Sequence, residues 1–230
     1  MRLVRLRPPG CVRCGRPLAR AVPGCVDCPP PGPVWARAPF LYEGPARTAL
    51  MCLKFGGTAS FAEAFGPSMA QALDRAPSDG HRAATDGSRG PVVSWVPLGR
   101  ARKRARGFDQ AEALARALAR CSGLPVRRLL DRTVETSPQA RKPGEHRRIA
   151  VEGAFEAVAS APGATVVLVD DVLTSGATAA ECARVLLTAG ATEVGVLTAA
   201  RSLGVPLPAR CYDPNVLLPG SVVARERFSR

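Results

Sequence analysis

Two adjacent acidic residues, Asp170 and Asp171, stand between an apolar run and a stretch of small residues. Carboxylates accept hydrogen bonds from vicinal hydroxyl groups, so this pair could hold a ribose. The residues that follow the pair would lie at the start of a helix, where free backbone N–H groups attract a phosphate. They are Thr174, Ser175, Gly176, Ala177 and Thr178. The spacing therefore indicates a site for a ribose 5-phosphate, unless the two acids only cap the next helix.

The residues on either side of the acidic pair predict a strand, a loop and a helix. Residues 166–169 form a valine-rich run typical of a buried parallel strand. Apolar residues then recur at helical spacing over 176–190, where Gly190 offers a C-cap. In open α/β sheets, ligands bind beyond the carboxyl ends of the strands. The loop lacks the lysine of a nucleoside triphosphatase loop, so the sequence does not favour that class of enzyme.

The segment VVLVDDVLTSGAT, residues 166–178, resembles the phosphoribosyl-pyrophosphate (PRPP) motif of type I phosphoribosyltransferases. The resemblance implies that Asp170 and Asp171 hold the ribose hydroxyls and that residues 174–178 hold the 5-phosphate. It also implies the reaction of that family, in which Mg²⁺ and arginines neutralise the departing pyrophosphate while the carboxylates stabilise the sugar. No residue of the sequence identifies an acceptor amine or nucleobase.

A second segment that could bind a ligand is a run of basic residues that follows an apolar strand pattern. We expect a strand over 92–96, a loop over 97–107 and a helix over 108–121. Five of the seven residues over 100–106 are Arg or Lys. Such a run is usually solvated surface, but its position after a strand would place it at the same sheet edge as the acidic pair. A pyrophosphate at that edge would need cations.

This second segment, VPLGRARKRARGFDQ, is similar to the V-P-[LV] … R-x-R-G-F-N-Q segment of the ComF family. These are competence-related, phosphoribosyltransferase-like proteins that also begin with a cysteine-rich zinc module. The resemblance implies a pyrophosphate loop formed by Val96, Pro97, Leu98 and Gly99. It also implies that three further residues lie near this loop: Arg104, Arg106 and Gln110. Asp109 stands where the family usually has Asn, so the role of this position is open.

Four cysteines near the start of the chain form two C-x-x-C pairs separated by ten residues. They are Cys11, Cys14, Cys25 and Cys28. Four thiolates at this spacing predict a closed, structural zinc site, with a redox pair or an iron–sulfur site as the alternatives. Of the scattered cysteines, Cys52 and Cys182 fall in helical patterns, so we expect them in the core.

Residues 127–155 resemble the family's mobile loop less completely. The matching residues are Arg132, Thr136, Gln139 and Arg148, whereas Val151 replaces an expected Asn. In type I phosphoribosyltransferases this loop closes over the reacting sugar and excludes water. A basic surface connection is the alternative interpretation.

The elements together predict an α/β fold: a type I phosphoribosyltransferase-like, mostly parallel sheet flanked by helices, with a small N-terminal zinc-ribbon-like module. We expect the module over 1–33 and the larger domain over 34–230, with a flexible insertion at 76–90. The larger domain should begin with a strand and two helices over 34–75, and residues 193–200 should form another strand. Lys54, near the end of the first helix pattern, is ambiguous: a solvated helix end is the simpler interpretation, and its role is open.

Net charge and hydropathy limit which partners and which cellular location we expect for the protein. The chain has 230 residues, 46% of them hydrophobic, and a formal net charge of +13. It lacks a run of about 18 apolar residues and the apolar region of a signal peptide, so we expect a cytoplasmic protein without membrane insertion. The charge favours polyanions, which leaves open a non-catalytic module that binds single-stranded DNA or senses PRPP and works with competence or DNA-processing proteins. Aromatic side chains that stack on bases are sparse, at 5% of residues.

Overall fold

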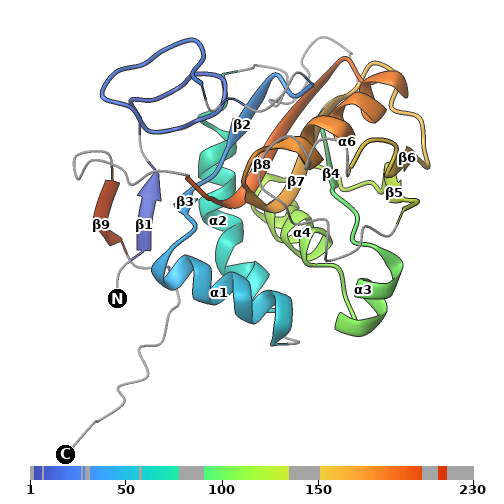
Figure 1. The fold of residues 1–230 in the computed structure, drawn as a ribbon, viewed down its shortest axis with the longest axis horizontal. Helices are drawn as coiled ribbons and strands as arrows, with labels where there is room; N and C mark the ends of the chain where they lie inside the picture. The colour runs from blue at the N-terminus through green and yellow to red at the C-terminus, as the bar shows by residue number, and fades with distance from the viewer. Residues whose placement is uncertain are drawn as a thin grey trace, which may run out of the picture.

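The computed structural model describes residues 3–6, 8–26, 28, 32–56, 59–77, 91–134 and 151–203, and the backbone of 212–216. Within these residues, seven strands form one sheet in the order β4-β7-β8-β3-β1-β9, with β2 also paired to β8 (Figure 1). The strands of this sheet are β1 (Leu3–Leu6), β2 (Trp35–Arg37), β3 (Phe40–Leu41), β4 (Val92–Trp95), β7 (Thr165–Leu173), β8 (Glu193–Arg201) and β9 (Tyr212–Val216). A separate antiparallel pair is formed by β5 (Leu130–Arg132) and β6 (Phe155–Ala157).

The centre of the large sheet is parallel, which confirms the predicted fold class. β7 pairs in parallel with β4 on one side and with β8 on the other, so Val169 lies opposite both Trp95 and Leu197. β2 and β3 also run parallel to β8, whereas β1 runs antiparallel to β3 and to β9. Because β4 and β7 are parallel neighbours, their carboxyl ends meet at one edge of the sheet.

Helices cover both faces of the sheet (Figure 1). Their bounds are α1 (Gly44–Phe55), α2 (Phe61–Leu73), α3 (Arg100–Arg106), α4 (Gln110–Ser122) and α6 (Ala177–Thr188). Alternate residues of β7 enter two different cores: Val167 and Val169 pack with α1, α2 and α4, whereas Val166 and Leu168 pack with α6. All four are fully buried, which explains why this strand reads as an unbroken apolar run.

Two local predictions are wrong. Residues 100–106 form the helix α3 where a loop was expected, because Arg, Lys and Ala are good helix formers. Gly107, in the left-handed region at φ 78°, ends this helix. In addition, Cys182 is buried as expected, but Cys52 is only half-buried, since it lies on a side of α1 that faces away from Leu50 and Leu53.

The N-terminal cysteine loops are attached to the large sheet. β1 contributes a strand to that sheet, and the chain then turns into the loops that carry Cys11 and Cys14. Two guanidinium groups hold these loops by their backbone carbonyls: the half-buried Arg37 donates to Val12 at 2.6 Å, and the buried Arg201 donates to Cys14 at 2.5 Å. No helix among the described residues is long and apolar enough to span a membrane.

Some predictions fall on residues outside the described part of the chain. Most of the expected insertion is among them, since the description stops at Pro77 and resumes at Pro91. Three residues of the expected mobile loop are as well: Thr136, Gln139 and Arg148.

Candidate functional site

Asp170 and Asp171 lie on β7 at the point where its neighbour β4 ends. β4 pairs with β7 as far as Trp95 and Val169, and the Val96 N–H still donates to the Val169 carbonyl at 2.9 Å. Beyond this point β7 continues beside β8 alone, through Leu173. Asp171 therefore stands two residues and Asp170 three residues before the end of their strand, rather than at its end as predicted, and no strand of the described residues pairs with β7 there on the β4 side.

Asp171 is the centre of a polar network that joins three elements to β7. Its Oδ2 forms an ion pair with the Lys54 Nζ at 2.8 Å and accepts a hydrogen bond from the Gln110 Nε2 at 3.4 Å. Arg106 extends the network, because its guanidinium donates to the Gln110 Oε1 at 2.9 Å. Two residues expected near the pyrophosphate, Arg106 and Gln110, are thus brought to one of the two acids.

Lys54, whose role the sequence left open, is not at a solvated helix end. Its side chain is 19% exposed and contacts Asp171. The last residues of α1 reach the carboxyl end of β7, so the lysine meets a carboxylate far away in the sequence. Helical spacing alone gave no signal for this contact.

Phe55, which follows Lys54, is a further residue of this site that the sequence did not indicate. Its side chain is 67% exposed, and the Arg106 guanidinium carbon lies 5.0 Å from the centre of its ring. Such a stacked pair joins an aromatic face to a cation beside Asp171.

Asp109, which stands where the ComF-like segment usually has Asn, has a structural role in this chain. Its Oδ1 accepts hydrogen bonds from the backbone N–H groups of Ala111 and Glu112, and so caps the N-terminus of α4. Its Oδ2 accepts the Leu98 N–H at 2.8 Å, so the same carboxylate fixes the loop over residues 96–99. Because Asp109 is 4% exposed, burial raises the pKa of this carboxyl.

The residues after β7 form an open turn that leads into α6. Thr174 and Ser175 are exposed, and the Ala177 N–H approaches the Ser175 Oγ at 3.5 Å. Gly176 has φ 77°, a conformation that residues with a side chain rarely adopt, and it starts the helix without a side-chain cap. The first N–H groups of this twelve-residue helix therefore lie just beyond the carboxyl end of β7.

The two acids differ in electrostatic environment. Asp171 is paired with the Lys54 ammonium, whereas burial, followed by the charge of Asp171, raises the pKa of Asp170 to about 8. The Asp170 Oδ1 also accepts the Asp171 N–H at 2.8 Å. The protonated form of Asp170 is therefore favoured by its burial and by the neighbouring Asp171.

Two residues that the sequence placed near the site do not contact the network around Asp171. Arg104 lies on the exposed part of α3, which projects from the molecule at the lower right of Figure 1. Arg132 lies on β5, with its guanidinium carbon 5.1 Å from the centre of the Phe155 ring.

The four N-terminal cysteines converge on one point and could hold a metal ion. All four sulfurs lie within 4.8 Å of one another. The shortest distances are 3.5 Å between Cys11 and Cys28, 3.6 Å between Cys14 and Cys25, and 4.0 Å between Cys25 and Cys28. A tetrahedral ion bound to sulfur at about 2.3 Å separates its ligand sulfurs by about 3.8 Å. The cluster thus has the size of a four-thiolate site.

Comparison with known proteins identifies the family. A model of the phosphoribosyl transferase domain matches residues 104–217. The DNA utilization protein YhgH of Salmonella typhimurium (strain LT2) is 31% identical over 205 residues, which cover 88% of each chain. The competence protein ComFC of Bacillus subtilis (strain 168) is 31% identical over 207 residues, which cover 84% of this chain and 78% of the relative. The chain belongs to the ComF family.

A ComF-family chain has the phosphoribosyltransferase type of fold, and the strand-end network lies within the matched domain apart from the residues of α1. Among solved structures, the allosteric regulatory enzyme of purine biosynthesis is similar, with a TM-score of 0.38 and 24% identity. That similarity covers 62% of this chain and 26% of the enzyme.

Proposed function

We propose that this ComF-family protein binds PRPP at the shared carboxyl edge of β4 and β7. The observation that carries the proposal is the network around Asp171, which brings Lys54, Gln110 and Arg106 beside the acidic pair. In this assignment Asp170 and Asp171 accept the ribose hydroxyls, and residues 174–178 at the start of α6 receive the 5-phosphate. The loop over 96–99, fixed by Asp109, receives the pyrophosphate together with Arg106.

Mg²⁺ fits the donor set of this site. The ion prefers carboxylate and phosphate oxygens, and Asp170 offers a carboxylate that no cation of the described residues contacts directly. When bound, Mg²⁺ would neutralise charge on the pyrophosphate. The protein's own groups would orient the ribose and stabilise positive charge that develops on the sugar, so displacement of pyrophosphate is the reaction that we assign to the site.

The unmodified protein tests this proposal. Calorimetric titration with PRPP and Mg²⁺ should show one site per chain, and incubation with a panel of amines and nucleobases should release pyrophosphate with at least one of them. Binding without release from any acceptor would assign a PRPP-sensing role. The absence of PRPP binding would contradict the proposal itself.

A second candidate function, binding of single-stranded DNA, is favoured by α3. This helix carries five basic residues and no acid, and the Arg100 side chain is 76% exposed. The net charge of +13 and the names of the relatives, which refer to DNA utilization and competence, agree with a role in DNA handling. In this interpretation α3 contacts phosphates of the strand, in company with competence or DNA-processing proteins.

The salt dependence of DNA binding distinguishes a DNA-binding role of α3 from PRPP binding at the strand-end site. A variant with Arg100, Arg102, Lys103 and Arg104 changed to Ala should lower the salt slope by up to about 0.7 for each single-strand phosphate that the helix no longer neutralises. The Asp170→Asn/Asp171→Asn protein serves as the control and should keep the parent slope. If the parent and the α3 variant share one slope, α3 does not serve DNA.

We also propose that the ion of the four-cysteine cluster is Zn²⁺ and that it is structural. Four thiolates leave no open coordination position for a substrate, and the sulfur distances suit a tetrahedral ion. The cluster lies in loops held by Arg37 and Arg201, not at the strand-end network.

A further inference from the structure

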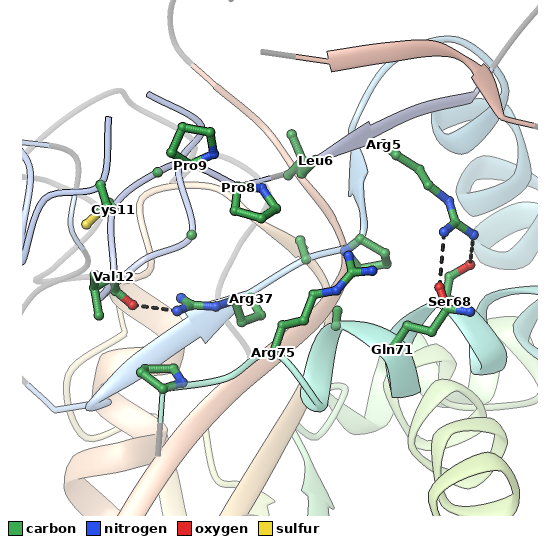
Figure 2. Close-up of a pocket in the computed structure, with 17 residues that line it drawn as sticks. Arg5, Leu6, Pro8, Pro9, Cys11, Val12, Arg37, Ser68, Gln71 and Arg75 are labelled. Atoms are coloured by element: carbon green, nitrogen blue, oxygen red, sulfur yellow. Dashed lines mark hydrogen bonds between the residues drawn. The ribbon is translucent and has the colours of Figure 1, made fainter. Parts of the chain in front are cut away.

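A cavity lies where the cysteine loops meet β1, β2 and the end of α2 (Figure 2). Its volume is about 340 Å³. The chain segments that line it are Arg5–Leu6, Pro8–Val12, Gly15, Ala21, Arg37–Pro39, Ser68, Gln71–Ala72, Arg75 and Pro77. None of these residues belongs to the strand-end network or to the turn before α6, so the cavity is distinct from the proposed PRPP site.

Three arginines from three different elements line this cavity, as Figure 2 shows. Arg5 comes from β1, Arg37 from β2, and Arg75 from the turn that follows α2. No Asp or Glu is among the described residues that line it. The described lining thus has three cations and no carboxylate, with Cys11 as its one thiol, in contrast to the strand-end site, where two carboxylates face the cations.

Two of the guanidinium groups are held in place by neutral acceptors. Arg5 donates to the Ser68 Oγ at 2.9 Å and to the Gln71 Oε1 at 3.1 Å. Arg37 donates to the carbonyls of Val12 and Ala36, and burial lowers its pKa. These contacts orient the two side chains without adding negative charge.

Arg75 is available for a ligand. Its side chain is exposed, it has no ion pair with any acid of the described residues, and Figure 2 shows it above the end of α2, between the other two arginines. A guanidinium fork binds phosphate through paired N–H groups. A phosphate monoester carries close to two negative charges at neutral pH, so it suits a cavity of three cations better than a carboxylate does.

The rest of the cavity wall suits a compact organic group. Leu6, Pro8, Pro9 and Pro39 provide apolar surface next to the arginines. Ligand cavities range from about 300 to about 1,000 Å³, so this one has the size for a small molecule. We propose that it binds a phosphate monoester of nucleotide size. Such a ligand would contact the cysteine loops on one side and α2 on the other.

The test uses thymidine 5′-monophosphate as the probe. It is titrated into protein with PRPP and Mg²⁺ at the concentration that fills the strand-end site, including the phosphate turn over 174–178. One site per chain should remain. Arg75→Gln should weaken binding at least tenfold and Arg75→Glu further, with zinc content and circular dichroism unchanged, because the Arg75 side chain is exposed.

Arg20→Gln is the matched control, since Arg20 is an exposed arginine of the cysteine loops that does not line the cavity. It should bind the probe as the parent does. Ribose 5-phosphate, tested in parallel, shows whether the ligand needs a base, and binding of either phosphate ester supports the proposal. Equal affinity for unphosphorylated thymidine, or unchanged affinity in both Arg75 variants, would overturn it.

Discussion

At the residue scale, the two acids of β7 have different protonation behaviour. The pKa of Asp170 is raised from 3.8 to about 8, because its burial and the charge of Asp171 disfavour the carboxylate. Between these two pH values the folded protein binds more protons than the unfolded chain. The contribution of Asp170 to the free energy of unfolding is therefore present at low pH and is lost as the pH rises through about 8.

Replacement of Asp170 by Asn should remove this pH dependence. We expect the free energy of unfolding of the parent to fall relative to that of Asp170→Asn as the pH rises from about 4 to about 8. Urea denaturation at several pH values measures the difference. If the two proteins keep a constant difference over this range, the pKa of Asp170 is not raised.

The ion pair between Lys54 and Asp171 gives a second prediction at this scale. Lys54→Met would leave a largely buried carboxylate without its cation, which costs about 1–3 kcal/mol of unfolding free energy. Lys54→Arg keeps the charge and should lose less. A double-mutant cycle of Lys54→Met with Asp171→Asn should show a coupling energy, and additivity of the two changes would contradict the ion pair.

At the element scale, Asp109 joins the loop over 96–99 to the start of α4. Asp109→Ala removes the helix cap and the acceptor of the Leu98 N–H, so it should lower the unfolding free energy by about 1–2 kcal/mol. Asn also caps helices but has only one acceptor oxygen, so Asp109→Asn can keep the cap while it loses the acceptor of the Leu98 N–H, and it should lose less than Asp109→Ala. Thermal denaturation compares the three proteins, and an equal loss in the Ala and Asn variants would argue against the cap.

The helices and strands that the sequence predicted are those with strong apolar periodicity. The valine-rich runs of β4 and β7 and the amphipathic α4 are in this group. α3 was missed because its basic residues carry no apolar stripe, although they favour a helix. The cap by Asp109 had a signal in the sequence, since Glu112 follows three residues later as in a capping box.

At the scale of the whole molecule, the features that the sequence predicted are local in the chain, whereas those it missed join residues far apart in the sequence. The two C-x-x-C pairs and the acidic pair are local motifs, and the structure brings each set together. The contact of Lys54 with Asp171, and the cavity lined by Arg5, Arg37 and Arg75, depend on how distant elements pack. Periodicity identifies the elements but does not say which of their ends meet.

The cysteine cluster gives a prediction at this scale. The protein should contain about one zinc ion per chain, and Cys14→Ala should lose it. Because small metal modules derive much of their folding energy from the ion, zinc removal should expose the backbone of the cysteine loops while α4 and β7 stay protected. Hydrogen exchange with and without chelator measures this. Zinc-free protein with fully protected loops would contradict it.

The central claim is that Asp170 and Asp171 hold the ribose of PRPP, and one measurement tests it directly: the dissociation constant of PRPP for the Asp170→Asn/Asp171→Asn protein. The change removes charge-assisted hydrogen bonds worth about 1.5–3 kcal/mol each, so affinity should fall at least tenfold with the fold intact. Asp74→Asn, a single change of the same kind at an exposed helix end, is the control and should bind as the parent does. If the double variant binds PRPP as tightly as the parent, the two acids do not bind the sugar and the assignment of this site is wrong.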